Sequence, residues 1–398
     1  MDRAVREVVA HAYDNSTAFR NRMEEAGLTP DDIAGVDDLV KIPVLQKDTL
    51  ISLQASKPPF GGMLGLDMSA IARVFISPGP IFDPQGVEED FWRWRETLEV
   101  AGFHKGDVVI NTFSYHLTPA GFMFDSGLRA LGAVVVPTGV GNTEQQVKIV
   151  DHLGVTGYVG TPSFLHNILR KSMEMGHDPG SLPLKKAFVS AEMLPESLRR
   201  EFEEEWGITT RQGYGTADLG AVAYECNEKA GMHVSSGIVL QICDPYTGEP
   251  LPEGEIGEVV VTLCDKLYPL IRFGTGDLSL LTTEPCPCGR TSPRLVRIAG
   301  RVGSSVKVRG MFVHAQQISE LVNGHPKIEG IQCVITRVDQ RDILTMRVAA
   351  KEPFSSEEIK DFMNKAHNTI KVRVDRVDFV PPDALKNRPV FKDERVWD

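Results

Sequence analysis

The sequence RQGYGTADLGAVAYECNEKAGMH, residues 211 to 233, holds the features around which the rest of the chain can be interpreted. Tyr214, Gly215 and Thr216 read as the end of a strand entering a tight turn, because glycine adopts backbone angles that other residues avoid. Asp218 follows, so a phenol, a hydroxyl and a carboxylate share one turn, which suits nucleotide or metal binding. Taken alone, the stretch is explained equally well as a surface turn with scattered polar residues.

Composition places the chain among globular proteins. Its 398 residues suffice for two or three domains, and 42% hydrophobic with 24% charged residues is ordinary. The net charge of −11 argues against nucleic-acid binding, which needs basic surface. No apolar run approaches a membrane span, and the start MDRAVREVVAHAYDN is not a signal peptide. We therefore expect a cytoplasmic protein without membrane or nucleic-acid partners, whose six cysteines are free thiols or metal ligands.

Strands and helices alternate through the middle of the chain, which predicts a mostly parallel sheet with helices on both faces. The expected strands are 107–112, 133–137, 157–160 and 186–190, and the expected helices are 119–131, 144–153, 162–174 and 195–206. Ligands of such sheets bind beyond the carboxyl ends of the strands. Three strand-end clusters are therefore candidate sites: Tyr115 with His116, Ser190 with Ala191 and Glu192, and the turn from Tyr214 to Asp218.

The segments before this alternation follow other patterns. Residues 1 to 60 are expected to form helices that pack without contributing chemistry, with Val5, Val8, Val9 and Ala12 on one apolar face. Residues 72–76 predict a short strand and 88–100 a helix. Between them the segment SPGPIFDPQG, residues 77–86, is expected to be a loop. Its three prolines donate no N–H and it has no lysine, so it is a poor phosphate-binding loop.

The segments after the alternation predict an antiparallel meander and then a second domain. The meander starts at about residue 237 and leads into YPLIRFGTGDLSLL, where Asp277 could accept hydrogen bonds from sugar hydroxyls, although a plain turn aspartate is the alternative. A Gly- and Ser-rich linker near residues 299–305 divides an α/β domain, 1–299, from a small α+β domain, 300–398. The latter should contain strands 331–339, 343–350 and 373–379 and helix 356–370.

Four side chains form a predicted metal site. Six residues separate Cys226 from His233, and Cys286 and Cys288 flank a proline in EPCPCGR. Three thiolates and an imidazole match a closed, tetrahedral, structural zinc site. Four unrelated residues are the alternative, but the CPCG sequence is unusual and favours zinc that ties the turn to the strand after Asp277. The remaining cysteines are expected in the core: Cys243, Cys264 and Cys333.

Over nearly its whole length the chain resembles the phenylacetate–coenzyme A ligase family of adenylate-forming enzymes. Several motifs carry the likeness in order: YGTADLG, GVGNTEQQ, GTPSFLHNI, VSAEMLPESLRREFEEEWGI, AVAYECNEKAGMHV, CDPYTGEPLPEGEIGEVVVT, PLIRFGTGDLSLL, EPCPCGRT and the GR…VKVRG run. The resemblance implies an adenylate-forming ligase fold, in which a large N-terminal domain binds acid and nucleotide and a small C-terminal domain rotates between two half-reactions. It also suggests a homodimer.

The family activates a carboxylic acid with ATP and Mg²⁺ and passes the acyl group to coenzyme A. The resemblance therefore implies an AMP-forming acid–coenzyme A ligase for an aromatic or arylacetic acid. It implies nucleotide contacts at Ser190, Ala191, Glu192, Tyr214, Gly215 and Thr216, ribose binding at Asp277, and a hinge at Arg301. It further implies a catalytic lysine at Lys392, an acid pocket at Tyr115 and His116, and Asp218 in place of a glutamate near Mg²⁺. Zinc-bearing members show the arrangement of Cys226, His233, Cys286 and Cys288.

Two other functions stay open on the sequence. The acyl group could pass to an amine or a carrier-protein thiol instead of coenzyme A. Alternatively, the chain could be a ligase-like protein that binds nucleotide or acyl-coenzyme A without turnover. The segment at residues 77–86 favours this last hypothesis, because the family has a loop rich in Ser, Thr and Gly with a lysine there. Asp277, Arg301 and Lys392 favour the ligase.

Overall fold

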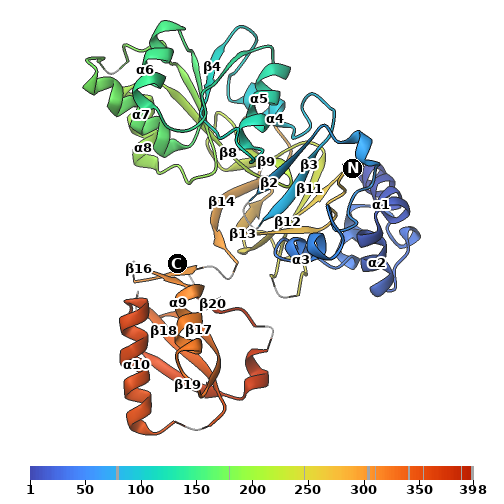
Figure 1. Ribbon diagram of the computed structural model, residues 1–398, viewed down its shortest axis with the longest axis vertical. Helices are drawn as coiled ribbons and strands as arrows, with labels where there is room; N and C mark the ends of the chain where they lie inside the picture. Colours follow the sequence, from blue (N-terminus) through green and yellow to red (C-terminus); the bar gives the residue numbers. More distant parts are fainter. Residues whose placement is uncertain are drawn as a thin grey trace. The chain divides into compact units, whose positions relative to one another are not determined.

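The computed structural model describes the chain except for residues 78–79, 179, 246, 303–304, 310, 339–340, 353, 387 and 396–398. Two residues of the predicted 77–86 loop and two of the predicted linker are therefore outside the described residues. The chain divides into two compact units, Met1–Ile298 and Ala299–Asp398 (Figure 1). No helix among the described residues combines the length and the apolar character needed to cross a bilayer.

Parallel strands form one half of the main sheet, as the alternating pattern predicts. They lie in the order β5-β4-β6-β7-β8 and are all parallel. Helix α7 starts where expected, because the Thr161 side chain accepts a hydrogen bond from the Phe164 backbone N–H and proline suits the first helical position. The bounds are β4 Val108–Asn111, β5 Val134–Pro137, β6 Gly157–Gly160, β7 Lys186–Val189, β8 Thr209–Thr216, α5 Ala120–Ala130, α6 Thr143–His152, α7 Pro162–Glu174 and α8 Glu196–Arg200, which continues as a π-helix over Glu201–Glu205.

Antiparallel strands form the other half of the same sheet. Strand β8 belongs to both halves, because the chain reverses after Thr216 and β9 runs back antiparallel beside it. The order from the far edge is β11-β12-β13-β14-β10-β9-β8, and β1 adds parallel to β13, which gives a 12-stranded sheet over the described residues. The bounds are β1 Leu45–Gln46, β9 Gly220–Glu225, β10 Met232–Val234, β11 Ile238–Cys243, β12 Gly257–Leu263, β13 Phe273–Thr282 and β14 Arg294–Arg301.

The N-terminal segment packs on the antiparallel half. Its helices are α1 Asp2–Asn15, α2 Thr17–Glu25 and α3 Thr49–Ser56, with 3-10 turns at Pro30–Asp32 and Val36–Lys41. The predicted apolar face of α1 is confirmed: Val5, Val8, Val9 and Ala12 are buried in one cluster with Val239 of β11 and Ile271. Burial of this apolar face packs α1 against the sheet.

Two predictions between residues 72 and 100 are wrong in part. The segment at 77–86 is not all loop: β2 (Arg73–Ser77) and β3 (Ile81–Gln85) form an antiparallel hairpin, with Val74 opposite Pro84. The helix expected over 88–100 is shorter, because α4 covers Trp94–Val100. Asp90 explains the late start, since its carboxylate accepts the backbone N–H groups of Trp94 and Arg95 and so caps the helix there.

The smaller unit is an α+β fold with its own core. A sheet in the order β19-β18-β17-β20 and a hairpin of β15 and β16 pack with helices α9 and α10. Helix α10 begins with a capping box, in which Ser355 and Glu358 bond each other's backbone N–H. The bounds are β15 Ser305–Val308, β16 Met311–His314, α9 Ala315–Asn323, β17 Ile328–Val338, β18 Arg341–Ala350, α10 Ser356–Ile370, β19 Arg376–Val380 and β20 Phe391–Asp393, with 3-10 turns at Met68–Ala70 in the larger unit and Pro382–Leu385.

Candidate active site and metal centre

Two of the three strand-end clusters are directly joined. Strands β7 and β8 are parallel neighbours, so their carboxyl ends meet at one edge of the sheet. There the Ser190 hydroxyl, buried after β7, donates to the Gly213 carbonyl of β8 at 2.8 Å. Ala191 has a left-handed φ of +69°, a conformation that side chains with a Cβ rarely adopt. Glu192 accepts the Ser163 backbone N–H at 3.3 Å, at the start of α7.

The turn after β8 has no room for a larger residue at Gly215. A Cβ built there would lie 2.4 Å from the Gly220 carbonyl oxygen and 2.7 Å from the Trp94 ring. The Thr216 hydroxyl accepts the Leu219 N–H at 3.2 Å and closes the turn. The side chains that follow are therefore held against the sheet, and Asp218 is buried.

Tyr214 on β8 and Asp277 on β13 form a polar pair, although β14, β10 and β9 lie between these two strands in the order of the sheet. The Tyr214 hydroxyl donates to Asp277 Oδ2 at 2.8 Å, and the Asp277 N–H donates to the Thr275 hydroxyl at 3.1 Å. Both Tyr214 and Asp277 are half-buried. A fixed, partly exposed carboxylate can accept two hydroxyl groups of a sugar, so the structure brings together residues that the sequence placed far apart.

Sequence reasoning missed Lys47, which contacts the site turn. Its ammonium lies 2.5 Å from Asp218 Oδ2, with 19% of the lysine side chain and none of the aspartate side chain exposed. Lys47 follows β1, and its backbone N–H donates to the Gly274 carbonyl of β13 at 3.1 Å. Residues 1–60 were expected to pack without contributing chemistry, and the structure adds that one of them is paired with a carboxylate of the site turn. No local pattern could have identified this lysine, because its partner is 171 residues away.

The contact with Lys47 also affects whether Asp218 can bind Mg²⁺. The carboxylate is enclosed, and an ammonium group already neutralises it at 2.5 Å. A Mg²⁺ ion needs near-octahedral oxygen ligands and keeps several waters, which an enclosed, lysine-paired carboxylate does not offer. In this arrangement Asp218 does not fit the role of a magnesium ligand.

Tyr115 and His116 lie in a hollow at the ends of β4 and β5. The hollow measures about 530 Å³ and is lined by residues 114–116 and 137–140. The Tyr115 hydroxyl donates to Asp125 Oδ2 at 3.1 Å and accepts from Asn111 Nδ2 at 2.8 Å. Burial, and then the charge of Asp125, raise the pKa of Tyr115 above its ordinary value. This phenol is therefore anchored to α5, while His116 is exposed.

Arg301 and Lys392 belong to the smaller unit. Arg301 ends β14 and is exposed. Lys392 lies on β20, opposite Val334 of β17, and its side chain is 48% exposed with Nζ 2.6 Å from Glu394 Oε1. An exposed ion pair of this kind is weak, so the ammonium group can exchange its partner for another anion.

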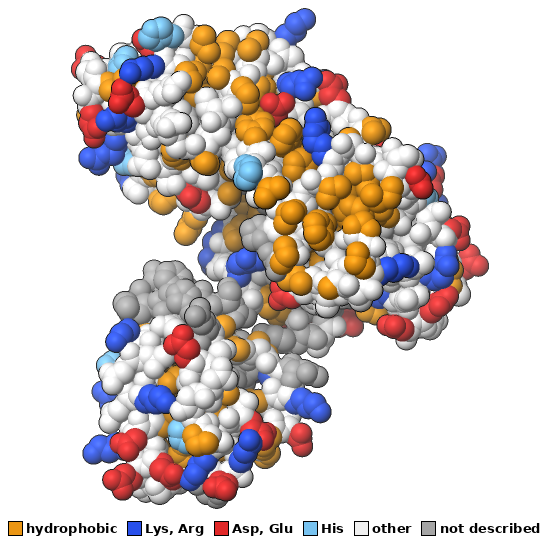
Figure 2. Space-filling model, viewed as in Figure 1, with side chains coloured by type: hydrophobic (Ala, Val, Ile, Leu, Met, Phe, Trp, Pro, Cys, Tyr) orange, Lys and Arg blue, Asp and Glu red, His pale blue; other side chains and the backbone are white. Residues whose placement is uncertain are grey.

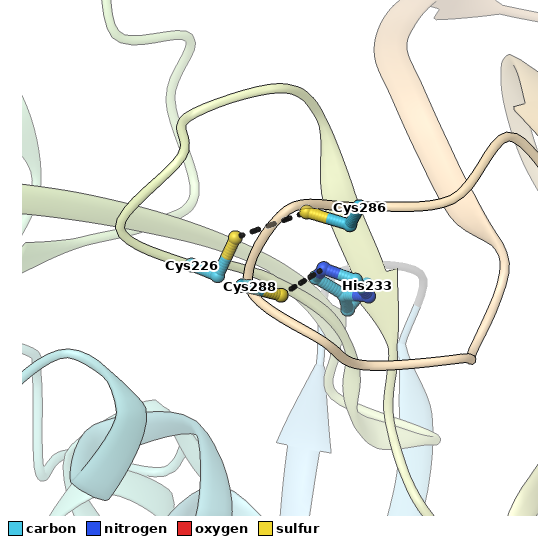
Figure 3. Close-up of side chains that lie close together, drawn as sticks. All are labelled: Cys226, His233, Cys286 and Cys288. Atoms are coloured by element: carbon cyan, nitrogen blue, oxygen red, sulfur yellow. Dashed lines mark hydrogen bonds between the residues drawn. The ribbon is translucent and has the colours of Figure 1, made fainter.

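The four predicted metal ligands come together in space (Figure 3). The ligand atoms of Cys226, His233, Cys286 and Cys288 all lie within 4.8 Å of one another. The Cys226 and Cys286 sulfurs are 3.8 Å apart, and Cys288 Sγ is 3.3 Å from His233 Nε2. Bonds of about 2.3 Å from zinc to sulfur at tetrahedral angles place two sulfurs roughly 3.8 Å apart. The spacing of these atoms therefore fits zinc.

Two further observations support a cation at this cluster. His233 Nδ1 lies 3.2 Å from the Ser292 carbonyl oxygen, which fixes the tautomer that leaves Nε2 free to bind a metal. Burial, and then the neighbouring thiols, raise the pKa of Cys226 to about 11. Without a cation that thiol keeps its proton, whereas a bound divalent cation would favour the thiolate. The cluster joins the β9–β10 connection to the loop between β13 and β14.

Comparison with known proteins identifies the class. The AMP-binding enzyme family matches residues 90–263. A crystal structure of an open conformation of 2-hydroxyisobutyryl-CoA ligase in complex with 2-HIB-AMP and CoA superposes with a TM-score of 0.73 and 26% identity, covering 99% of this chain and 90% of that one. The fold is that of an adenylate-forming enzyme, and the chain is an AMP-forming acid–coenzyme A ligase that uses ATP and coenzyme A.

The family follows from closer relatives. The phenylacetate-coenzyme A ligase of Thermus thermophilus is 32% identical over 366 residues, which cover 89% of this chain and 81% of that protein. The phenylacetate-coenzyme A ligase of Aromatoleum evansii is 29% identical over 411 residues, covering 98% and 91%. The chain belongs to the phenylacetate–coenzyme A ligase family.

Proposed function

We propose that this ligase activates an aromatic or arylacetic acid. The acid's carboxylate attacks the α-phosphorus of ATP and releases pyrophosphate, and the coenzyme A thiolate then attacks the acyl carbon and releases AMP. The observation that carries the proposal is the joined strand-end site, in which Ser190 bonds Gly213 and Tyr214 bonds Asp277. Such a site offers a carboxylate for a ribose diol beside a turn for the adenine and phosphates.

Each unit has its own part in this proposal. The larger unit would bind acid and nucleotide, with Ser190, Ala191, Glu192, Tyr214, Gly215 and Thr216 around the adenosine. The smaller unit would bring Lys392 to the α-phosphate, where an ammonium group stabilises the negative charge that builds up during adenylation. Arg301 would lie at the hinge, and Tyr115 with His116 would line the acid pocket. Mg²⁺ would arrive with the ATP phosphates, which are its usual ligands.

The zinc ion would be structural. Cys226, His233, Cys286 and Cys288 would fill all four positions of a tetrahedral ion, leaving none for a substrate. Its contribution would be to hold the β9–β10 connection, at the end of β9 remote from the site turn, against the loop between β13 and β14. The cysteines of the described residues form no disulfide, as is usual in a reducing compartment, and this supports the expected cytoplasmic location.

A homodimer is part of the proposal. Figure 2 shows hydrophobic side chains gathered on the face of the larger unit where the β2–β3 hairpin lies. Val74 on β2 and Val87 after β3 are 47% and 71% exposed. Apolar surface of this kind marks interfaces. Sedimentation should give a dimer for the wild type and more monomer for Val87→Asp, and a monomeric wild type would contradict the proposal.

One assay tests the reaction. Pyrophosphate release from ATP is measured with a panel of aromatic and arylacetic acids, with and without coenzyme A. Sustained release only with coenzyme A supports the ligase. Release that needs an amine or a carrier thiol in its place points to another acceptor. No release with any acid would leave nucleotide binding without turnover, the alternative that the sequence of the segment at residues 77–86 favours.

A further inference from the structure

A buried carboxyl group on the β2–β3 hairpin has no role in the site described above. Asp83, on β3, is 2% exposed and faces the carboxylate of Asp218. The groups around this pair come from three other elements. Lys47 follows β1, and the buried Tyr268 precedes β13. Ser77, at the end of β2, has a buried hydroxyl close to Asp83.

The hydrogen bonds of this cluster require one more proton. Asp218 Oδ2 accepts from Lys47. With both carboxylates ionised, Asp218 Oδ1 and both oxygens of Asp83 have no hydrogen bond of ordinary geometry within the part of the chain that the structure describes, and the nearby Ser77 hydroxyl can donate to only one of these three atoms. Two buried like charges side by side also repel each other. A single proton on Asp83 removes one charge and supplies the donor that Asp218 Oδ1 lacks.

The surroundings of Asp83 favour that proton. Burial, and then the charge of Asp218, raise the pKa of Asp83 to about 8. The nearby Lys47 and Ser77 lower this pKa, but by less than burial and Asp218 raise it. A carboxyl group kept neutral by its environment can act as a hydrogen-bond donor at neutral pH.

We propose that Asp83 is a positioning residue, whose protonated carboxyl group donates to Asp218 Oδ1 while Lys47 holds Oδ2. The Asp218 carboxylate is then held from both sides, by a proton from the hairpin and by an ammonium from the N-terminal segment. Strand β3 thus contributes a hydrogen-bond donor to the site turn. Its catalytic consequence rests on the proposed function, but the arrangement itself does not.

The test compares Asp83→Asn with the wild type across pH. The amide has the shape of the protonated acid and donates at every pH. In the wild type the raised pKa means that the native state binds more protons than the unfolded state, so stability falls as pH rises from about 4 to about 8 and then levels off. The unfolding equilibrium constant of D83N relative to wild type should therefore fall by up to ~10-fold per pH unit in that window.

Chemical denaturation at pH values between about 5 and 9 measures this ratio. The exposed Asp14→Asn serves as the control, and its ratio to wild type should not follow this course. Asp83→Ala, which removes the donor, should be less stable than D83N throughout. A D83N ratio that does not change with pH, or D83N no more stable than D83A, would overturn the proposal. If neither variant folds, infrared spectra of the wild type decide, because a protonated carboxyl band absent at neutral pH would also overturn it.

The activity assay separates this inference from the proposed function. Pyrophosphate release by D83N relative to wild type should rise as pH passes about 8, where the wild-type Asp83 loses its proton. A chain that releases no pyrophosphate with any acid but shows the pH-dependent stability difference would refute the ligase function and support the carboxyl pair. Turnover without that stability difference would support the ligase function and refute the carboxyl pair.

Discussion

At the scale of the residue, the contact between Lys47 and Asp218 matters most for the site. It is short, both side chains are largely removed from water, and it joins the N-terminal segment to the turn between β8 and β9. A buried ion pair adds little when compared with an apolar pair, but losing one partner leaves a charge uncompensated. The contribution of Lys47 to the free energy of unfolding is therefore measured by substituting the lysine while Asp218 is kept.

We expect Lys47→Met to lower the free energy of unfolding by about 3 kcal/mol, because it strands the buried Asp218 carboxylate. The double variant Lys47→Met with Asp218→Asn should recover most of that loss. Urea denaturation of the single and double variants measures both. The control is Lys57→Met, an exposed lysine whose ammonium donates to the Thr17 hydroxyl, with an effect within about 0.5 kcal/mol. Additive losses in the double variant would contradict the pairing.

Residue patterns foretold some of these groups and not others. Ser190 follows β7 and Tyr214 lies near the end of β8, so their place at the carboxyl ends of parallel strands follows from local sequence and the rule for parallel sheets. Asp277 follows Gly276 on β13 in the antiparallel half, where that rule does not apply. Lys47 and Asp83 carry no such signal. Lys47 reaches Asp218 because β1 pairs with β13, and Asp83 reaches it because β2 and β3 form a hairpin. The spacing of apolar residues along the sequence does not predict such contacts between distant segments.

At the scale of the element, boundaries were predictable where the sequence contains caps. Helices α7 and α10 lie at the predicted residues because Thr161 and Ser355 supply side-chain caps. Strand β3 was missed because Pro84 suggests a loop, although proline is tolerated in a two-stranded hairpin that has free edges. The late start of α4 depends on Asp90, whose capping role a broad helical pattern conceals.

The metal cluster also acts between elements, since it joins the β9–β10 connection to the β13–β14 loop. We expect purified protein to contain about one zinc ion per chain. Cys288→Ser should abolish zinc binding and lower the melting temperature, as chelator should in the wild type, because metal binding contributes to folding. Metal analysis with thermal denaturation measures both.

The matched control for this cluster is Cys264→Ser, a half-buried cysteine outside it. That variant should keep its zinc. Wild-type protein that is free of zinc and melts unchanged in chelator would refute the structural metal site. Loss of zinc in the control would show that the assay reports general damage instead of ligand removal.

At the scale of the whole molecule, the chain consists of two units with separate cores, and the lysine proposed for catalysis lies on the smaller one. The Lys392 side chain is 48% exposed, so its removal should change the stability of the protein little. A two-unit enzyme of this kind can present different faces of the small unit in successive half-reactions.

We expect Lys392→Ala to slow adenylation by about 100-fold, the order lost when a charge-stabilising donor is removed. Thioester formation from a supplied acyl-adenylate should change little, and so should the melting temperature. Single-turnover assays of each half-reaction measure the difference. Lys386→Ala, an exposed lysine of the same unit, is the control. Equal loss in both half-reactions would argue against separate conformations for the two steps.

The two-residue strand β1 has a consequence for shortened versions of this chain. Leu45 and Gln46 lie against Phe273 and Gly274 of β13, whose other edge is occupied by β12. A protein expressed from residue 48 onward would leave that stretch of backbone without its neighbour, and an open strand edge recruits other chains. Such a fragment should associate through its bare edge and precipitate, even though every motif that marks the family would still be present in it.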